Sequence, residues 1–198
     1  MQIFFIRHGK TQWNLERRLQ GQNGDSPLLD ASYVEMERIH DQLKPINFDR
    51  VLTSPQPRAI KTLERLTDLP YNTDSRLSEW NFGEVEGMEI VEAVARYPQE
   101  MYDSRNALDR FDGSVFGAES VDSVLARFDS LLAELRTNRR ERVLLIGHGA
   151  SGTAGLRHWL GYDKSQLRAV GGIDNLRLTL LETAENRQII CQKWNEEI

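Results

Sequence analysis

Cysteine is nearly absent from this chain of 198 residues, in which Cys191 is the only one. A single cysteine forms no intramolecular disulfide and builds no cysteine-based metal site, which is typical of a protein in a reducing compartment. Basic residues are not in excess either, because the formal net charge is -5 at pH 7. General binding of nucleic acid depends on surplus Lys and Arg that neutralise phosphates, so we expect no nucleic-acid partner. A few arginines gathered in one pocket can still bind a small anion.

Long hydrophobic runs are also missing. The N-terminal run "QIFFI" is too short for a signal peptide or a membrane span. We therefore expect a cytoplasmic protein with no membrane partner, and nothing in the pattern indicates an oligomeric state. The composition, 39% hydrophobic and 28% charged, is ordinary for a globular protein. The length suits one domain that covers residues 1–198.

Apolar runs of strand length alternate with stretches of helical periodicity along the chain. This alternation predicts an α/β fold with a mainly parallel sheet that is covered on both faces. The last two predicted strands, joined by "ETAENR", are expected to form a hairpin, which makes the sheet mixed. The predicted strands are Gln2–Ile6, Arg50–Thr53, Tyr71–Thr73, Arg142–Ile146, Leu176–Leu181 and Gln188–Lys193.

Four helices are expected between the strands. The Ser32-x-x-Glu35 pattern resembles a capping box that opens a helix ending near Pro45. Pro57 stands where the first helical position of "PRAIKTLERL" is expected, and "ASGTAGLRHWLG" predicts a helix that stops at Gly161. A long helix is predicted by an apolar stripe of Val121, Val124, Leu125, Phe128, Leu131, Leu132 and Leu135.

The stretch from about Glu84 to Ala118 has little periodicity and is rich in charges and glycine. It is long for a connection within a compact domain, so we interpret it as an insertion or lid that faces the substrate.

Two of the predicted strands each end in a His-Gly pair, "RHG" near the N-terminus and "GHG" near residue 148. Ligands of open α/β sheets bind beyond the carboxyl ends of the strands, so Arg7, His8 and His148 are expected at one site. The neighbouring glycines, Gly149 among them, have no Cβ and let a ligand approach the backbone. A third strand end, "LTSPQPRAIKT", adds Arg58. Two arginines and two histidines together favour a tetrahedral dianion.

A carboxylate is still needed as a proton donor. "RLSEWNFGEVEG" supplies several, and Glu79 is the best placed because it lies in a loop just past the Tyr71–Thr73 strand. Glu84 and Glu86 are close alternatives. Arg17 and Arg18 could extend an anionic pocket, but we interpret them as part of a solvated face.

The segments "RHGKT", "SPQPRAIKT", "LSEWNFGEVEG" and "IGHG" resemble, in order and spacing, the phosphoglycerate mutase-like branch of the histidine phosphatase superfamily. The resemblance covers nearly the whole chain and implies a three-layer α/β/α sandwich with a mixed sheet. It implies His8 as the nucleophile and Glu79 as the residue that protonates the leaving oxygen and then activates water. Arg7, Arg58 and His148 would bind the phosphoryl group, and the substrate side would be lined by Asn14, Gln20 and Gly21. The family needs no metal, so we expect no metal and no cofactor.

The resemblance favours a phosphomonoesterase that acts on a small phosphorylated metabolite through a phosphohistidine. Three alternatives stay open: a cofactor-dependent phosphoglycerate mutase, an inactive phosphate-binding module, and a metal-dependent hydrolase. No key His or Arg is missing, which disfavours the inactive module, and arginines beside the histidines would repel a metal ion. The stretch from Glu84 to Ala118 has only Arg96, Arg105 and Arg110 as cations. We therefore expect a second phosphate to be poorly neutralised and water to be the usual acceptor.

Overall fold

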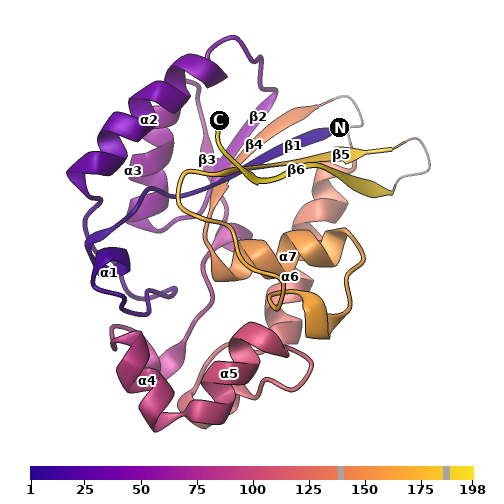
Figure 1. Cartoon of the computed structure of the whole chain (residues 1–198). Coiled ribbons are helices and arrows are strands. Elements are labelled where there is room, and N and C mark those ends of the chain that lie inside the picture. Colours follow the sequence, from indigo (N-terminus) through magenta and orange to yellow (C-terminus); the bar gives the residue numbers. More distant parts are fainter. Residues whose placement is uncertain (138–140, 185–187) are drawn as a thin grey trace.

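The computed structural model describes residues 1–137, 141–184 and 188–198. Its centre is a six-stranded sheet with the order β3-β2-β4-β1-β5-β6 (Figure 1). β1, β2, β3 and β4 are parallel, whereas β5 runs antiparallel to β1, and β6 antiparallel to β5. All six predicted strands are therefore confirmed, although part of the connection between β5 and β6 lies outside the described residues. The strands are β1 (Gln2–Arg7), β2 (Arg50–Thr53), β3 (Asn72–Thr73), β4 (Arg142–Gly147), β5 (Leu178–Thr183) and β6 (Ile189–Glu196).

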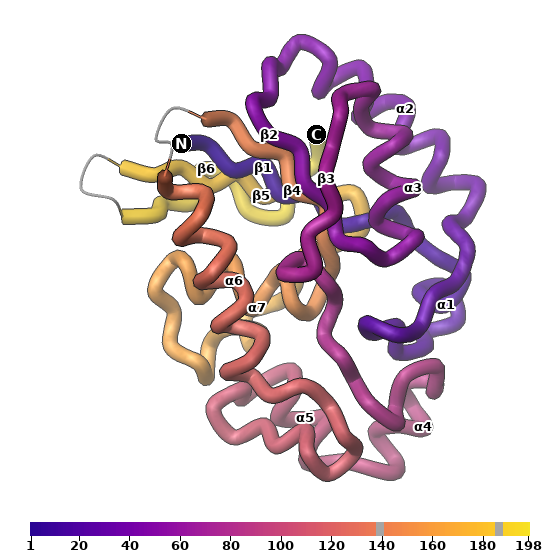
Figure 2. The backbone as a smooth tube through the Cα atoms, turned by 180° about the vertical axis from the view of Figure 1, so that it is seen from behind, coloured from indigo at the N-terminus to yellow at the C-terminus, as the bar shows by residue number. Residues whose placement is uncertain are grey.

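Helices cover both faces of the sheet, as Figures 1 and 2 show. Successive side chains of a strand point to opposite faces. Ile3 and Phe5 of β1 accordingly pack with α6 (Val121–Leu135) and α7 (Ala150–Trp159). Phe4 and Ile6 pack on the other side with α2 (Asp30–Leu43) and α3 (Pro57–Leu66). This burial from both sides explains why β1 and β4 are continuous apolar runs, and it confirms the three-layer sandwich.

Most of the predicted helix signals are confirmed. Pro57 opens α3, all seven residues of the predicted apolar stripe are buried in α6, and α7 ends before Gly161. The capping box at Ser32 is wrong, because α2 begins at Asp30 and its N-cap, Leu29, makes no side-chain cap bond. The Ser32 hydroxyl instead donates to the main-chain oxygen of Lys10 (3.0 Å). Among the described residues, no helix is long and apolar enough to cross a membrane.

The stretch from 84 to 118 contains two helices that the sequence did not reveal, α4 (Ile90–Arg96) and α5 (Pro98–Asn106). Both are short, and each buries few residues, so neither produces a clear periodicity. They share a small apolar core made by Val85, Ala93, Met101 and Phe116. Figure 1 shows them together at the end of the molecule farthest from β6. The remaining elements are α1 (Gln12–Leu15) and the 3-10 turns Ser75–Leu77, Gly83–Val85, Gly113–Phe116 and Lys164–Gln166.

Candidate active site

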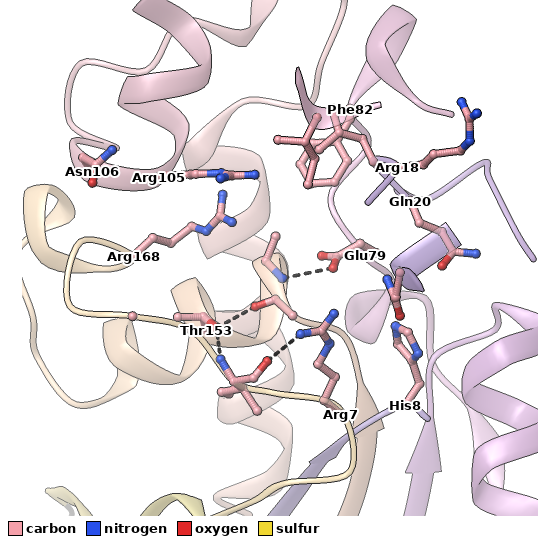
Figure 3. Close-up of a pocket in the computed structure, with 18 of the residues that line it drawn as sticks. Arg7, His8, Arg18, Gln20, Glu79, Phe82, Arg105, Asn106, Thr153 and Arg168 are labelled. Atoms are coloured by element: carbon pink, nitrogen blue, oxygen red, sulfur yellow. Dashed lines mark hydrogen bonds between the residues drawn. The ribbon is translucent and has the colours of Figure 1, made fainter. Parts of the chain in front are cut away.

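A cavity of about 450 Å³ lies beyond the carboxyl ends of β1 and β4, where the two His-Gly pairs were predicted to meet (Figure 3). The loop after α1, the stretch from 84 to 118, α7 and the loop after α7 complete its wall. Arg58, His148 and Gly21 are buried beside the cavity without lining it. Six of the nine predicted site residues do line it: Arg7, His8, Asn14, Gln20, Glu79 and Gly149.

His8 is held with one ring nitrogen free. Its side chain is buried, and Nδ1 lies 2.7 Å from the main-chain oxygen of Gly9. A carbonyl oxygen only accepts, so Nδ1 carries the proton and Nε2 keeps its lone pair. Burial, together with the positive charges of Arg58 and Arg7, holds the pKa of His8 well below its ordinary value. His8 is therefore a neutral imidazole at neutral pH, which is the form a nucleophile requires.

Arg7 lies against the backbone at the start of α7. Its Nη1 donates to the main-chain oxygen of Ile173 (2.7 Å). A Cβ added at Gly149 would be 2.9 Å from Cζ of Arg7. Glycine at position 149 thus makes room for the guanidinium, which fixes Arg7 in the wall of the cavity.

Arg58 organises the loop that follows Gln20. Its two terminal nitrogens donate to the main-chain oxygens of Gly21 (2.9 Å) and Gly24 (2.8 Å), and Nη1 also pairs with Asp25 (3.1 Å). A Cβ at Gly21 would lie 2.7 Å from the main-chain oxygen of Trp80, so glycine is needed for that close approach. The structure thus shows Arg58 and Gly21 shaping the loop, and their predicted contacts with substrate stay predictions.

His148 is fully buried, and its ring centroid lies 5.1 Å from that of His8. Its Nε2 is 2.7 Å from Oγ of Ser54 and 2.9 Å from Oε1 of Gln56. Burial and the nearby charge of Arg58 hold the pKa of His148 well below its ordinary value, so it is neutral as well. Sequence reasoning missed Ser54 and Gln56, although both belong to the same "SPQPR" segment as Arg58.

The Glu79 carboxylate sits at the N-terminus of α7. Its Oε1 accepts the main-chain N–H groups of Trp80 (2.8 Å) and Ser151 (2.7 Å), and its Oε2 accepts that of Ala150 (3.0 Å). These bonds fix the direction of the carboxylate beside the cavity. Glu84 and Glu86 do not line the cavity. Glu79 is thus the best placed of the three predicted carboxylates.

Asn14 and Gln20 reach the cavity while holding the loops around it. Oδ1 of Asn14 accepts from the backbone of Thr11 (3.2 Å) and from Nδ2 of Asn175 (3.3 Å). Nδ2 of Asn175 also donates to the main-chain oxygen of His8 (2.9 Å). Oε1 of Gln20 accepts from the Thr11 hydroxyl (2.7 Å). Sequence reasoning missed Asn175, which precedes β5 and carries no motif.

Three further arginines line the cavity. Arg18, interpreted as part of a solvated face, also lines the cavity, and its guanidinium forms partly exposed ion pairs with Glu16 (2.9 Å) and Glu89 (3.3 Å), neither of which lines the cavity. Arg105 comes from α5 and Arg168 from the loop after α7 (Figure 3). No sequence motif links these two residues, and only the fold brings them to one wall.

The donor set does not fit a metal centre. Within residues 1–137, 141–184 and 188–198, no group of three or more His, Cys, Asp and Glu side chains is arranged to hold a metal ion. His8 is flanked by guanidinium groups, and both oxygens of Glu79 already accept backbone N–H groups. This arrangement disfavours the metal-dependent hydrolase.

Comparison with known proteins agrees with the motifs. A family model described as "Histidine phosphatase superfamily (branch 1)" matches residues 3–197. "Uncharacterized phosphatase PhoE" of Bacillus subtilis (strain 168) is 28% identical over 152 residues, 75% of this chain and 72% of that protein. "Probable phosphoglycerate mutase GpmB" of Salmonella paratyphi A is 30% identical over 155 residues, 75% of this chain and 70% of that protein. The structure of mycobacterial glucosyl-3-phosphoglycerate phosphatase with VO3 matches with a TM-score of 0.87 and 25% identity, covering 99% of each chain. The chain therefore belongs to the histidine phosphatase superfamily, branch 1.

Proposed function

We propose that this protein is a phosphomonoesterase that hydrolyses a small phosphorylated metabolite through a phosphohistidine at Nε2 of His8, without a metal ion. The observation that carries the proposal is the state of His8: a neutral imidazole with a free Nε2 at the edge of a cavity that also contains Arg7 and Glu79. The relatives named as phosphatases support this class of reaction.

The first half-reaction transfers the phosphoryl group to His8. The lone pair of Nε2 attacks phosphorus, the P–N bond forms, and the P–O bond to the alcohol breaks. Glu79, in its acid form, gives a proton to the leaving oxygen. Arg7 stabilises the charge on the phosphoryl oxygens, and its contact with Ile173 holds it in place before the reaction.

The second half-reaction returns the enzyme to its starting state. The Glu79 carboxylate takes a proton from water, the water oxygen attacks phosphorus, and the P–N bond breaks. Inorganic phosphate leaves, His8 is again neutral, and Glu79 holds a proton for the next substrate. Splitting hydrolysis into two displacements lowers the barrier of each.

A phosphohistidine has a distinct chemical signature, which tests the proposal. Wild type quenched during turnover of labelled substrate is expected to retain label that is lost in acid and kept in base, and His8→Ala is expected to retain none. Activity is expected to persist after prolonged treatment with chelator. The matched control is His158→Ala, because His158 on α7 pairs with Asp129 and does not line the cavity. Full activity in His8→Ala, or label on another residue, contradicts the proposal.

A cofactor-dependent phosphoglycerate mutase is the second candidate function. It is favoured by the similarity to GpmB and by two arginines that line the cavity, Arg105 and Arg168. The sequence argument against a second phosphate counted Arg105 but not Arg168. 3-Phosphoglycerate supplied with 2,3-bisphosphoglycerate separates the two functions. Formation of 2-phosphoglycerate much faster than release of phosphate would identify a mutase.

A further inference from the structure

We propose that the substrate carries a second anionic group, a carboxylate or a second phosphate, which binds Arg105 and Arg168 on the wall across the cavity from His8. The inference rests on the proposed phosphomonoesterase function and narrows its substrate class. Figure 3 shows the two side chains directed toward the same space, with Glu79 between them and His8.

Two chain segments supply the pair. Arg105 belongs to the last turn of α5, and Arg168 follows the turn Lys164–Gln166. Both line the same cavity as Arg7 and His8. A cavity of about 450 Å³ suits a small ligand, so one small molecule can reach both the phosphoryl site and this wall.

Neither guanidinium has a carboxylate partner in the described part of the chain, unlike Arg18, Arg58 and Arg110. Arg105 makes no hydrogen bond or ion pair there. Arg168 donates one, from Nη1 to the main-chain oxygen of Ser104 (2.6 Å), and its other nitrogens have no partner. Two guanidinium groups that share a wall without an anion repel each other, and a bound anion relieves that repulsion.

Arg168 is held in an unfavourable environment for a cation. Burial, with the positive charges of Arg105 and Arg7, lowers its pKa to about 10, so it remains charged at neutral pH. The negative charge of Glu79 acts against this and raises the pKa of Arg168. In the described part of the chain Glu79 forms no ion pair with either arginine, because its oxygens are turned to the backbone N–H groups of Trp80, Ala150 and Ser151.

A buried arginine fixes the loop that carries Arg168. Arg157 of α7 donates to the main-chain oxygens of Leu167 (3.0 Å), Val170 (3.1 Å) and Gly171 (2.7 Å). Its guanidinium also stacks over the Trp194 ring, with 4.6 Å between Cζ and the ring centroid. Three bonds from one buried charge restrain the loop, and such preorganisation lowers the cost of binding a ligand.

The test compares three phosphomonoesters built on one skeleton. Glycerol 3-phosphate has a hydroxymethyl group where 3-phosphoglycerate has a carboxylate and glycerol 1,3-bisphosphate has a second phosphate. Wild type is expected to show a kcat/KM about tenfold or more higher for at least one of the doubly anionic compounds, mainly through KM. The preferred compound distinguishes a carboxylate from a second phosphate.

Arg105→Gln and Arg168→Gln are each expected to reduce this preference about tenfold, whereas Arg105→Lys keeps part of it. Arg96→Gln is the matched control: it removes a charge from the same segment, does not line the cavity, and is expected to keep the preference. Thermal melts of each variant verify the fold.

The two proposals fail in different ways. Equal kcat/KM for all three compounds, unchanged by the variants, overturns the second anion site and leaves the phosphomonoesterase standing. If none of the three compounds is hydrolysed, the proposed function is decided by the phosphohistidine test with His8→Ala, and calorimetric titration of the three compounds decides the second anion site. If the doubly anionic compounds bind equally to wild type and to Arg105→Gln, the second anion site is overturned.

Discussion

Gly149→Ala probes the catalytic wall without touching a reactive atom. The added Cβ would lie 2.9 Å from Cζ of Arg7 and 3.1 Å from both Nε and Nη1. The backbone at Gly149, with φ -80° and ψ -51°, accepts alanine without strain. The guanidinium therefore has to move, and its bond to the main-chain oxygen of Ile173 (2.7 Å) weakens.

The magnitude follows from the role proposed for Arg7. Removing one preorganised donor from a developing negative charge costs about 10²–10³ in kcat, so Arg7→Met sets the upper limit. We expect Gly149→Ala to lose about 10²-fold in kcat/KM with 4-nitrophenyl phosphate, because the guanidinium is displaced and not removed. Overpacking is expected to lower the free energy of unfolding by about 1–3 kcal/mol, measured by urea denaturation.

A double-mutant cycle shows whether the effect passes through Arg7. When Arg7 is already methionine, Gly149→Ala is expected to cause little further loss of activity. Full activity in the single variant would refute the close contact. If the activity losses of Gly149→Ala and Arg7→Met add fully in the double variant, the effect of Gly149→Ala does not depend on Arg7.

Two further predictions concern proton transfer and pH. Glu79→Gln is expected to lower turnover of alkyl phosphates by about 10²–10⁴, and to slow single-turnover phosphorylation by 4-nitrophenyl phosphate less, because nitrophenolate leaves without a proton; equal losses on both substrates would exclude Glu79 as the acid. His8 and His148 have folded-state pKa values below those of an unfolded chain, so the unfolded state binds more protons in acid and stability is lost as the pH falls below about 6.5. The free energy of unfolding is expected to fall by up to about 1.4 kcal/mol per pH unit for each histidine, and His148→Gln is expected to show a shallower dependence. A free energy of unfolding that stays constant between about pH 7.5 and pH 5 would contradict this prediction.

Residues whose surroundings are set by nearby sequence were predicted well. β1 and β4 were found almost to their ends because burial on both faces leaves continuous apolar runs. His8 and Gly149 lie just after β1 and β4, and Glu79 lies in the loop past β3, so the topology brings them to one cavity with His148 buried beside it.

Residues whose surroundings depend on distant contacts were not predicted. Ser32 has the right spacing for a capping box, but its hydroxyl reaches Lys10, which local propensity does not reveal. Arg168 and Arg105 come from separate segments that meet only in the folded chain, and no motif marks either. α4 and α5 are too short for a period to emerge.

The position of β4 in the sheet has a consequence for folding during synthesis. β1 and β2 each pair with β4 and not with one another, although both precede it by a long stretch of chain. A nascent chain that ends before β4 leaves a gap between these two strands, with their hydrogen-bonding edges exposed. His8 then has neither His148 nor the N-terminus of α7 beside it. The catalytic cavity therefore cannot be complete until β4 and α7 have been synthesised, and before that point the facing edges of β1 and β2 have no strand between them.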